Sequence, residues 1–156
     1  MNKEFLIKRL GQNDTLIFKK LIQLFDEVFE NEISAPANET HLTTLLSKSE
    51  FIAFIAIANN EVAGGLTAYE LPMYYLENSE VYIYDIAVKS DFQRKGLGKK
   101  MLLALNDYCK QNGIKQMFVE AHDEDNHAID FYHSASGHAE KVVHFNFSTA
   151  TTGFLM

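Results

Sequence analysis

The sequence contains a single cysteine, Cys109, and only two prolines, eight glycines and no tryptophan among its 156 residues. One cysteine excludes an intramolecular disulfide, and nothing in the sequence indicates an oxidising compartment. The scarcity of proline and glycine leaves no low-complexity linker that would divide the chain. We therefore expect one domain that spans residues 1–156.

The sequence also lacks a long apolar run and an excess of positive charge. No apolar stretch reaches the length of about 20 residues that a membrane-spanning helix needs, and the opening MNKEFLIKRL is too mixed for a signal peptide. The 14 basic and 21 acidic residues give a net charge of −7, which disfavours non-specific binding to nucleic acid. We expect a soluble cytoplasmic protein with no nucleic-acid or membrane partner. Its acidity favours a cationic substrate, or simply aids solubility.

The composition is 47% hydrophobic and includes 12 Phe and 7 Tyr, enough for a sizeable core. Alternating or apolar segments predict strands, and apolar residues at helical spacing predict helices. The predicted strands are 5–9, 51–58, 62–71, 80–88, 115–121 and 142–147. The predicted helices follow Asn13-Asp14, Asn38, Lys95 and Asp125. Asn59-Asn60 predicts a tight turn, and Gly64-Gly65 a bulge or a close approach of another segment.

Residues 88–101, VKSDFQRKGLGKKM, join the end of a predicted strand to the start of a helix. The first N–H groups of a helix lack carbonyl partners and lie at its positive end, so they bind phosphate well. Gly96 and Gly98 allow the main chain to approach such a group closely. The positive charges of this loop come from Arg94, Lys95, Lys99 and Lys100. A solvated helix start explains the charge alone, but the spacing Gln93-x-x-Gly96-x-Gly98 favours a diphosphate site.

This spacing resembles the pyrophosphate-binding motif, Q/R-x-x-G-x-G/A, of the GCN5-related N-acetyltransferase (GNAT) superfamily. The resemblance is closer to one branch, the type I aminoglycoside (gentamicin) 3-N-acetyltransferases, and extends from about Leu16 to Phe145. The stretches that carry it are 25–29, 51–53, 64–72, 79–88 and His144-Phe145. It implies an α/β (α+β) fold with a mixed central sheet of about six to seven strands, four helices and a splay at the acetyl-CoA cleft.

The resemblance also implies which residues hold acetyl-CoA. The strand before the loop would bind the pantetheine and thioester through its main chain, and the loop would bind the pyrophosphate. The implied cofactor-binding residues are Ile86, Ala87, Val88, Gln93, Arg94, Lys95, Gly96, Leu97, Gly98, Lys99, Asp125 and Asn126. Asp125 stands where the family often has Asn, and Ser136-Gly137 includes one residue more than the usual spacing after Tyr132.

Three residues are predicted to take part in proton transfer. Asp85 is a carboxylate inside the hydrophobic stretch EVYIYDIAV, and burying an unpaired charge is costly, so it indicates an open cleft or a bound cation. We predict that Asp85 accepts the proton of the amine, directly or through water, with Glu80 as the alternative base. Two structural alternatives would also explain Asp85 in this strand: its side chain could cap a bulge, or it could pair with a lysine. By resemblance Tyr132 is the general acid, with packing as its alternative. Cys109 has no neighbouring His and is not expected to be a nucleophile.

Clusters of acidic residues suit an acceptor that carries several ammonium groups, such as an aminoglycoside, although each acid can equally be a solvated loop residue. The predicted substrate-binding residues are Asp26, Glu27, Glu30, Glu70, Glu80, Asp85, Asp123 and Glu124. The alternatives are acetylation of another amine, in a polyamine, an amino sugar or a protein lysine, and a non-catalytic acyl-CoA-binding module. No metal site is predicted, because His122 and His127 lack the spacing of metal ligands. The resemblance implies a homodimer through the last strands.

Overall fold

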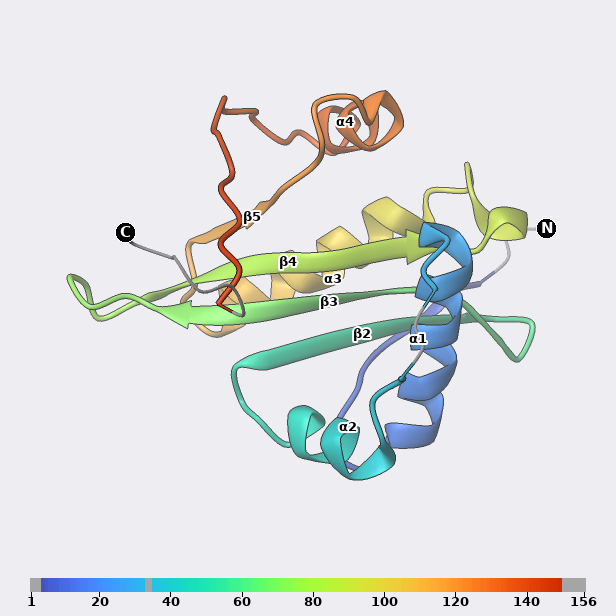
Figure 1. Cartoon of the computed structure of the whole chain (residues 1–156). Helices are drawn as coiled ribbons and strands as arrows, with labels where there is room; N and C mark the ends of the chain where they lie inside the picture. Colours follow the sequence, from blue (N-terminus) through green and yellow to red (C-terminus); the bar gives the residue numbers. More distant parts are fainter. Residues whose placement is uncertain (1–3, 33–34, 150–156) are drawn as a thin grey trace. The chain divides into compact units, whose positions relative to one another are not determined.

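The computed structural model describes residues 4–32 and 35–149, in two compact units divided after Glu120 (Figure 1). The first unit contains a mixed five-stranded sheet in the order β1-β2-β3-β4-β5, in which only β4 and β5 are parallel. Its strands are β1 (Leu6–Arg9), β2 (Phe51–Ala58), β3 (Glu61–Pro72), β4 (Ser79–Val88) and β5 (Gln116–Val119). Its helices are α1 (Thr15–Phe29), α2 (Glu39–Leu46), the 3-10 turn η1 (Ser90–Phe92) and α3 (Leu97–Gln111). The second unit holds α4 (Asn126–Ser134).

The mixed sheet and four α-helices confirm the predicted fold class, but the described sheet has five strands rather than six or seven. The prediction of a strand at 142–147 is wrong, because this stretch is not part of a strand in the structure. Its alternating apolar residues have high strand propensity, but a strand also needs a partner that hydrogen-bonds to its main chain.

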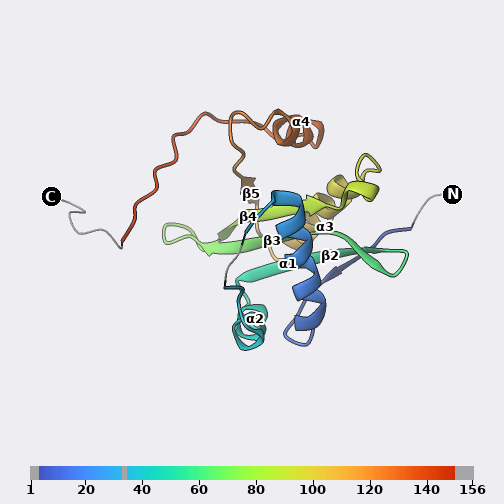
Figure 2. The same cartoon turned by 45° about the vertical axis from the view of Figure 1, so that its right-hand side comes forward.

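Two adjacent glycines on β3 show that helices cover both faces of the sheet. A Cβ on Gly65 would stand 2.7 Å from a methyl group of Leu21 on α1, whereas a Cβ on Gly64 would stand 3.4 Å from Met101 on α3. Successive residues of a strand point to opposite faces. The core beneath α1 and α2 therefore lies on one face and the core beneath α3 on the other. Figure 2 shows α1 and α3 on opposite sides of the sheet.

Short local signals set several element boundaries. The Asn38 side chain caps α2 by accepting a 2.8 Å hydrogen bond from the His41 amide. Asn59 and Asn60 both adopt positive φ, 51° and 61°, in the predicted turn between β2 and β3. Asp14 precedes α1, but its side chain does not cap the helix. It accepts hydrogen bonds from Lys8 Nζ and the Gly11 amide instead, both at 2.8 Å.

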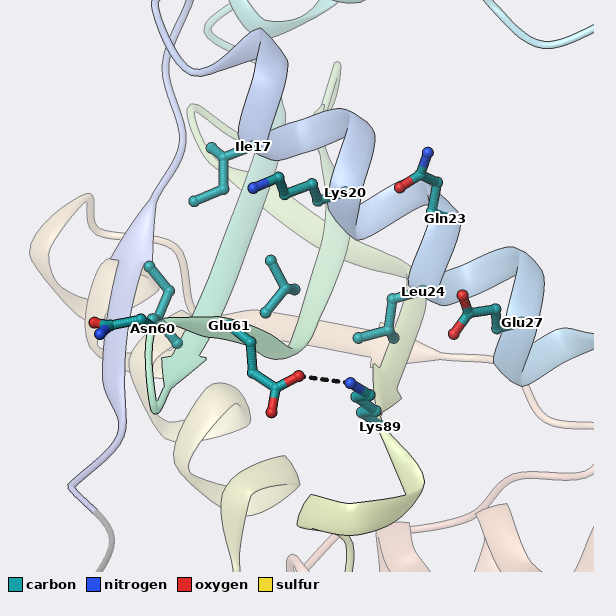
Figure 3. A pocket seen from close by; sticks show the side chains of 10 residues that line it. Ile17, Lys20, Gln23, Leu24, Glu27, Asn60, Glu61 and Lys89 are labelled. Carbon is teal, nitrogen blue, oxygen red and sulfur yellow. Dashed lines mark hydrogen bonds and ion pairs between the residues drawn. The ribbon is translucent and has the colours of Figure 1, made fainter.

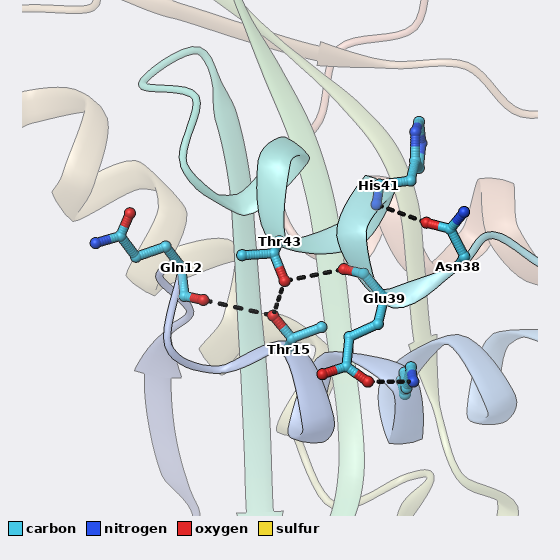
Figure 4. A network of polar contacts seen from close by, with 7 residues as sticks. Gln12, Thr15, Asn38, Glu39, His41 and Thr43 are labelled. Atoms are coloured by element: carbon cyan, nitrogen blue, oxygen red, sulfur yellow. Dashed lines mark hydrogen bonds and ion pairs between the residues drawn. The ribbon is translucent and has the colours of Figure 1, made fainter.

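A small polar network joins α1 to α2 (Figure 4). The hydroxyls of Thr15 and Thr43 are 2.8 Å apart, and Thr43 Oγ1 also donates to the Glu39 carbonyl at 2.9 Å. The Lys19 ammonium forms an ion pair with the Glu39 carboxylate at 3.0 Å. Buried hydroxyls need such partners, so this network fixes how the two helices lie together.

The second unit, taken by itself, is built around α4. The Asp125 carboxylate caps this helix by accepting a 3.0 Å hydrogen bond from the Ala128 amide. The Tyr132 carbonyl accepts from the Gly137 amide at 2.9 Å after the helix ends. Across the residues that the structure describes, no helix combines the length and the apolar character needed to cross a membrane.

Candidate active site

The sheet opens along β4. The β4–β5 ladder runs from the Glu80–Gln116 pair to the Ile83–Val119 pair, whereas β4 itself continues to Val88. Residues 85–88 are therefore paired in the described sheet with β3 alone. Their peptide groups on the β5 side are available to a ligand, because an edge strand exposes unpaired N–H and C=O groups. The predicted splay lies here, and it contains the main chain of Ile86, Ala87 and Val88.

A β-bulge marks the point of opening. Asp85 pairs with Thr67 and Ile83 with Ala68, so Tyr84 is an extra residue on β4. A bulge bends its strand and changes the direction of nearby side chains. Since Thr67 shares the face of Gly65, the register places Asp85 on the α1 face of the sheet.

Asp85 is half-buried, opposite the buried Thr67. Burial raises the pKa of the Asp85 carboxyl, which makes it a stronger proton acceptor than an ordinary aspartate. Among the ion pairs of the described residues none involves Asp85, so a lysine partner does not account for it.

An aromatic row crosses the sheet next to this carboxylate. The ring of Tyr84 lies 5.7 Å from Tyr69 and 6.0 Å from Tyr82, and Tyr82 stacks on Phe118 at 5.0 Å. Burial raises the pKa of Tyr82, and the carboxylate of Glu120, to which the Tyr82 hydroxyl donates a hydrogen bond, raises it further. These tyrosines and Glu120 were not predicted as site residues, although the alternation of Tyr82 and Tyr84 before Asp85 was a signal.

The basic loop folds back onto the end of β4. The Gln93 side-chain amide donates a 2.9 Å hydrogen bond to the Val88 carbonyl. Gly96 follows at a φ of 78° and precedes α3, whose first side chain, Leu97, is buried. Leu97 thus anchors the helix start, while the amides of Leu97, Gly98 and Lys99 belong to the first turn, which has no intrahelical partners for them.

Two lysines at this loop contact aromatic rings. Lys95 Nζ donates to the Asp91 carbonyl at 2.5 Å and lies 5.6 Å from the centre of the Phe92 ring. Lys100 Nζ lies 5.3 Å from the centre of the Phe5 ring. Arg94, at a φ of 61°, and Lys99 are exposed. A Cβ on Gly96 would meet nothing within 4 Å. The helix start is thus open and positively charged, and it fits a diphosphate.

The structure does not gather the predicted acids of the first unit into one cleft. Glu70 lies on the α3 face, where burial and then the Glu70 charge raise the pKa of the Cys109 thiol. Glu80 lies five residues before Asp85 along β4, which is about 16 Å at about 3.3 Å per residue. Asp26 and Glu30 lie at the end of α1, where Glu30 is the left-handed C-cap and its amide donates to the Asp26 carbonyl.

Glu27 lines a separate pocket of about 270 Å³ between α1, the β2–β3 turn and Lys89 (Figure 3). Lys89 forms a 2.6 Å ion pair with Glu61 in this pocket. The hydrogen bond that Lys89 donates to Glu61 in this ion pair raises the pKa of Lys89, with smaller contributions that include the charge of Glu27. The lining holds two Lys and two Glu, so it lacks the negative excess expected around a polyamine.

In the second unit, Asp123 and Glu124 are exposed, as are Asp125 and Asn126 at the start of α4. Tyr132 is half-buried, and its ring lies 5.1 Å from that of Phe131. In the first unit, the Cys109 thiol is buried and its pKa is raised, the opposite of an activated nucleophile. Within the described residues, no group of His, Cys, Asp and Glu could hold a metal ion.

Comparison with solved structures finds close likenesses over nearly the whole chain. An aminoglycoside acetyltransferase from an uncultured soil metagenomic sample, solved in complex with sisomicin, is 40% identical with a TM-score of 0.89. The match covers 92% of this chain and 95% of that one. A second soil metagenomic aminoglycoside acetyltransferase is 31% identical with a TM-score of 0.90, over 94% and 99% of the two chains.

Among curated sequences, the [ribosomal protein bS18]-alanine N-acetyltransferase of Escherichia coli K12 is 30% identical over 90 residues. That match covers 58% of this chain and spans 59% of the relative's own length. Residues 18–137, which contain the opened strand, the basic loop and α3, match the acetyltransferase (GNAT) family. This chain therefore belongs to the acetyltransferase (GNAT) family.

Proposed function

We propose that this chain transfers the acetyl group of acetyl-CoA to an amine of an aminoglycoside, by direct transfer and at the 3-amino position. The observation that carries the proposal is the half-buried Asp85 at the bulge where β4 leaves β5. The likeness to two aminoglycoside acetyltransferases supports this acceptor class, and the resemblance to type I 3-N-acetyltransferases supports the position.

Acetyl-CoA is the acyl donor of this family, and when bound it supplies the acetyl group as a thioester. The first-turn amides of α3, with Gly96 and Lys99, would hold its diphosphate. The free edge of β4 at Ile86, Ala87 and Val88 would hold the pantetheine arm. Gln93 braces this arrangement, because its side chain joins the loop to the Val88 carbonyl.

The residues divide the proton transfers between them. Asp85 accepts the proton that the acceptor ammonium must lose before its nitrogen forms an amide bond. Its raised pKa suits this role. Tyr132 gives a proton to the sulfur that leaves as the carbon–sulfur bond breaks, a role that rests on the family resemblance. The buried Cys109 takes no part.

An acceptor panel tests the proposal. Purified protein with acetyl-CoA should release coenzyme A with sisomicin or gentamicin, and mass spectrometry and NMR should find one acetyl group on the 3-amine. If coenzyme A is released only with spermidine, glucosamine or a peptide amine, the acceptor is of that class and is not an aminoglycoside. Binding of acetyl-CoA without turnover of any amine would favour a non-catalytic module.

The implied homodimer is also a proposal. Segment 142–147 exposes several large apolar side chains, between 68% and 76% accessible: Val142, Val143, Phe145 and Phe147. An interface between two copies would remove this apolar area from water. A cytoplasmic location stays a prediction from the sequence.

A further inference from the structure

Two carboxylates flank the point where β4 and β5 separate. Glu120 directly follows Val119, which forms the last β4–β5 pair with Ile83. Asp85 comes two residues after Ile83 on β4. Each strand therefore places one carboxylate just beyond the last pair. Neighbouring strands lie about 4.8 Å apart, so the main chains that carry these two acids are at least one strand spacing apart at the opening.

Tyr82 lies near both acids, because, besides burial, the charges of Glu120 and Asp85 both raise the pKa of its hydroxyl. Tyr82 contacts Tyr84 edge-on and stacks on Phe118 with an interplanar angle of 16°. Tyr84 is 60% exposed, so its ring is accessible at the mouth of the opening. Ring faces attract ammonium groups and cover the apolar faces of sugars. The Tyr82 hydroxyl donates a hydrogen bond to Glu120, which orients that carboxylate.

We propose that Glu120 is a specificity-determining residue, which binds a second ammonium group of the acceptor while Asp85 faces the amine that is acetylated, with the Tyr82 and Tyr84 rings nearby. The site then prefers amines that carry at least two positive charges. A molecule with one amine can present that amine to Asp85 but has no second ammonium group to bind Glu120. This inference rests on the proposed function and adds the number of charges that the acceptor must carry.

The experiment compares Glu120→Gln with the unchanged protein on two acceptors, sisomicin with several amines and glucosamine with one. For sisomicin we expect KM to rise about tenfold, as for a lost charge-assisted hydrogen bond, with kcat within about twofold. For glucosamine both constants should stay within about twofold. Glu120→Asp keeps the charge and should recover part of the sisomicin KM. Glu77→Gln, at an exposed acid in the β3–β4 loop, at the other end of β4 from the opening, is the matched control.

Circular dichroism and acetyl-CoA affinity check that Glu120→Gln is folded, since the substitution should change neither the spectrum nor the affinity. An equal rise in KM for both acceptors, or no rise for sisomicin, would overturn the role of Glu120 while leaving acetyl transfer intact. Failure of the unchanged protein to acetylate sisomicin would instead overturn the proposed function. An increased sisomicin KM in Tyr82→Phe, which loses only the hydroxyl bound to Glu120, would support the proposal further.

Discussion

Gly64 on β3 lies so close to the Ala87 carbonyl on β4 that a Cβ at position 64 would stand 2.7 Å from that oxygen. Both neighbours in this contact are main chain, so neither can rotate away. The stretch of β4 that we propose for the pantetheine arm therefore depends on the absence of a side chain one strand away.

Gly64→Ala should therefore destabilise the fold and weaken acetyl-CoA binding together, because β4 must shift to admit the methyl group. Overpacking of this kind costs about 1–3 kcal/mol, measurable by urea unfolding, with calorimetry for the cofactor. Gly11→Ala is the control, since its nearest atom would be 3.9 Å away. If Gly64→Ala and Gly11→Ala had the same unfolding free energy and the same acetyl-CoA affinity, the close approach of Gly64 to Ala87 would have no effect on folding or binding.

Gly96→Leu should weaken coenzyme A binding at least tenfold. The positive φ of Gly96 disfavours any side chain, and Leu would also fill the open space over the helix start. Gly113 has a similar φ of 71° and open surroundings at the other end of α3. Gly113→Leu therefore carries the same backbone strain without blocking the phosphate. Calorimetry with coenzyme A on both variants separates the backbone strain from the blocked site. Equal coenzyme A affinities of the two variants would contradict a diphosphate site at the start of α3.

Asp85→Asn should lower kcat by about 100- to 10,000-fold, the usual contribution of a general base. The unchanged enzyme should gain activity as pH rises through the raised pKa of Asp85, and this acidic limb should be missing in the variant. Steady-state kinetics across pH measures both. Full turnover by Asp85→Asn at every pH would remove Asp85 from the mechanism.

The same substitution should stabilise the protein at neutral pH. Burial raises the pKa of Asp85 in the folded state, so the folded chain holds this proton more tightly than the unfolded chain. The associated stability is complete at acid pH and is lost as the pH rises through the folded pKa. Asp85→Asn should therefore have a higher Tm at pH 7, with the difference shrinking toward about pH 4, near the ordinary Asp value. A lower Tm of Asp85→Asn at pH 7 would contradict the conclusion that partial burial destabilises the ionised Asp85 carboxylate.

Tyr132→Phe should lower kcat by about 100-fold with little change in acceptor KM, because it removes the proposed acid but keeps the ring beside Phe131. Tyr74→Phe removes a hydroxyl from a tyrosine that is 99% exposed and serves as the control. Turnover of Tyr132→Phe equal to that of the control would leave the residue with a packing role.

Phe145→Glu should convert the proposed dimer into monomers, since it places a charge among the exposed apolar side chains of segment 142–147. Size-exclusion chromatography with light scattering gives the mass directly. Tyr74→Glu adds the same charge in the β3–β4 loop and should leave the mass unchanged. A monomeric unchanged protein would end the dimer proposal.

The sequence by itself determined the features that depend on neighbouring residues. The Asn38 cap, the positive φ angles of Asn59 and Asn60, and the glycine before α3 follow from local backbone and side-chain chemistry. The order of helices and strands up to α4 follows from the spacing of apolar residues. Gly64 was also readable, because a glycine inside a strand indicates a close approach.

Only the tertiary structure decided which side chains share a face and which strands find a partner. The bulge at Tyr84 sets the face of Asp85, and the β3–β4 register separates Asp85 from Glu70. The meeting of Tyr82 with Glu120 requires the parallel pairing of β4 with β5 across α3. Segment 142–147 has strand-like alternation without strand pairing. Each outcome depends on register between distant segments, and a shift of one residue exchanges the two faces of a strand.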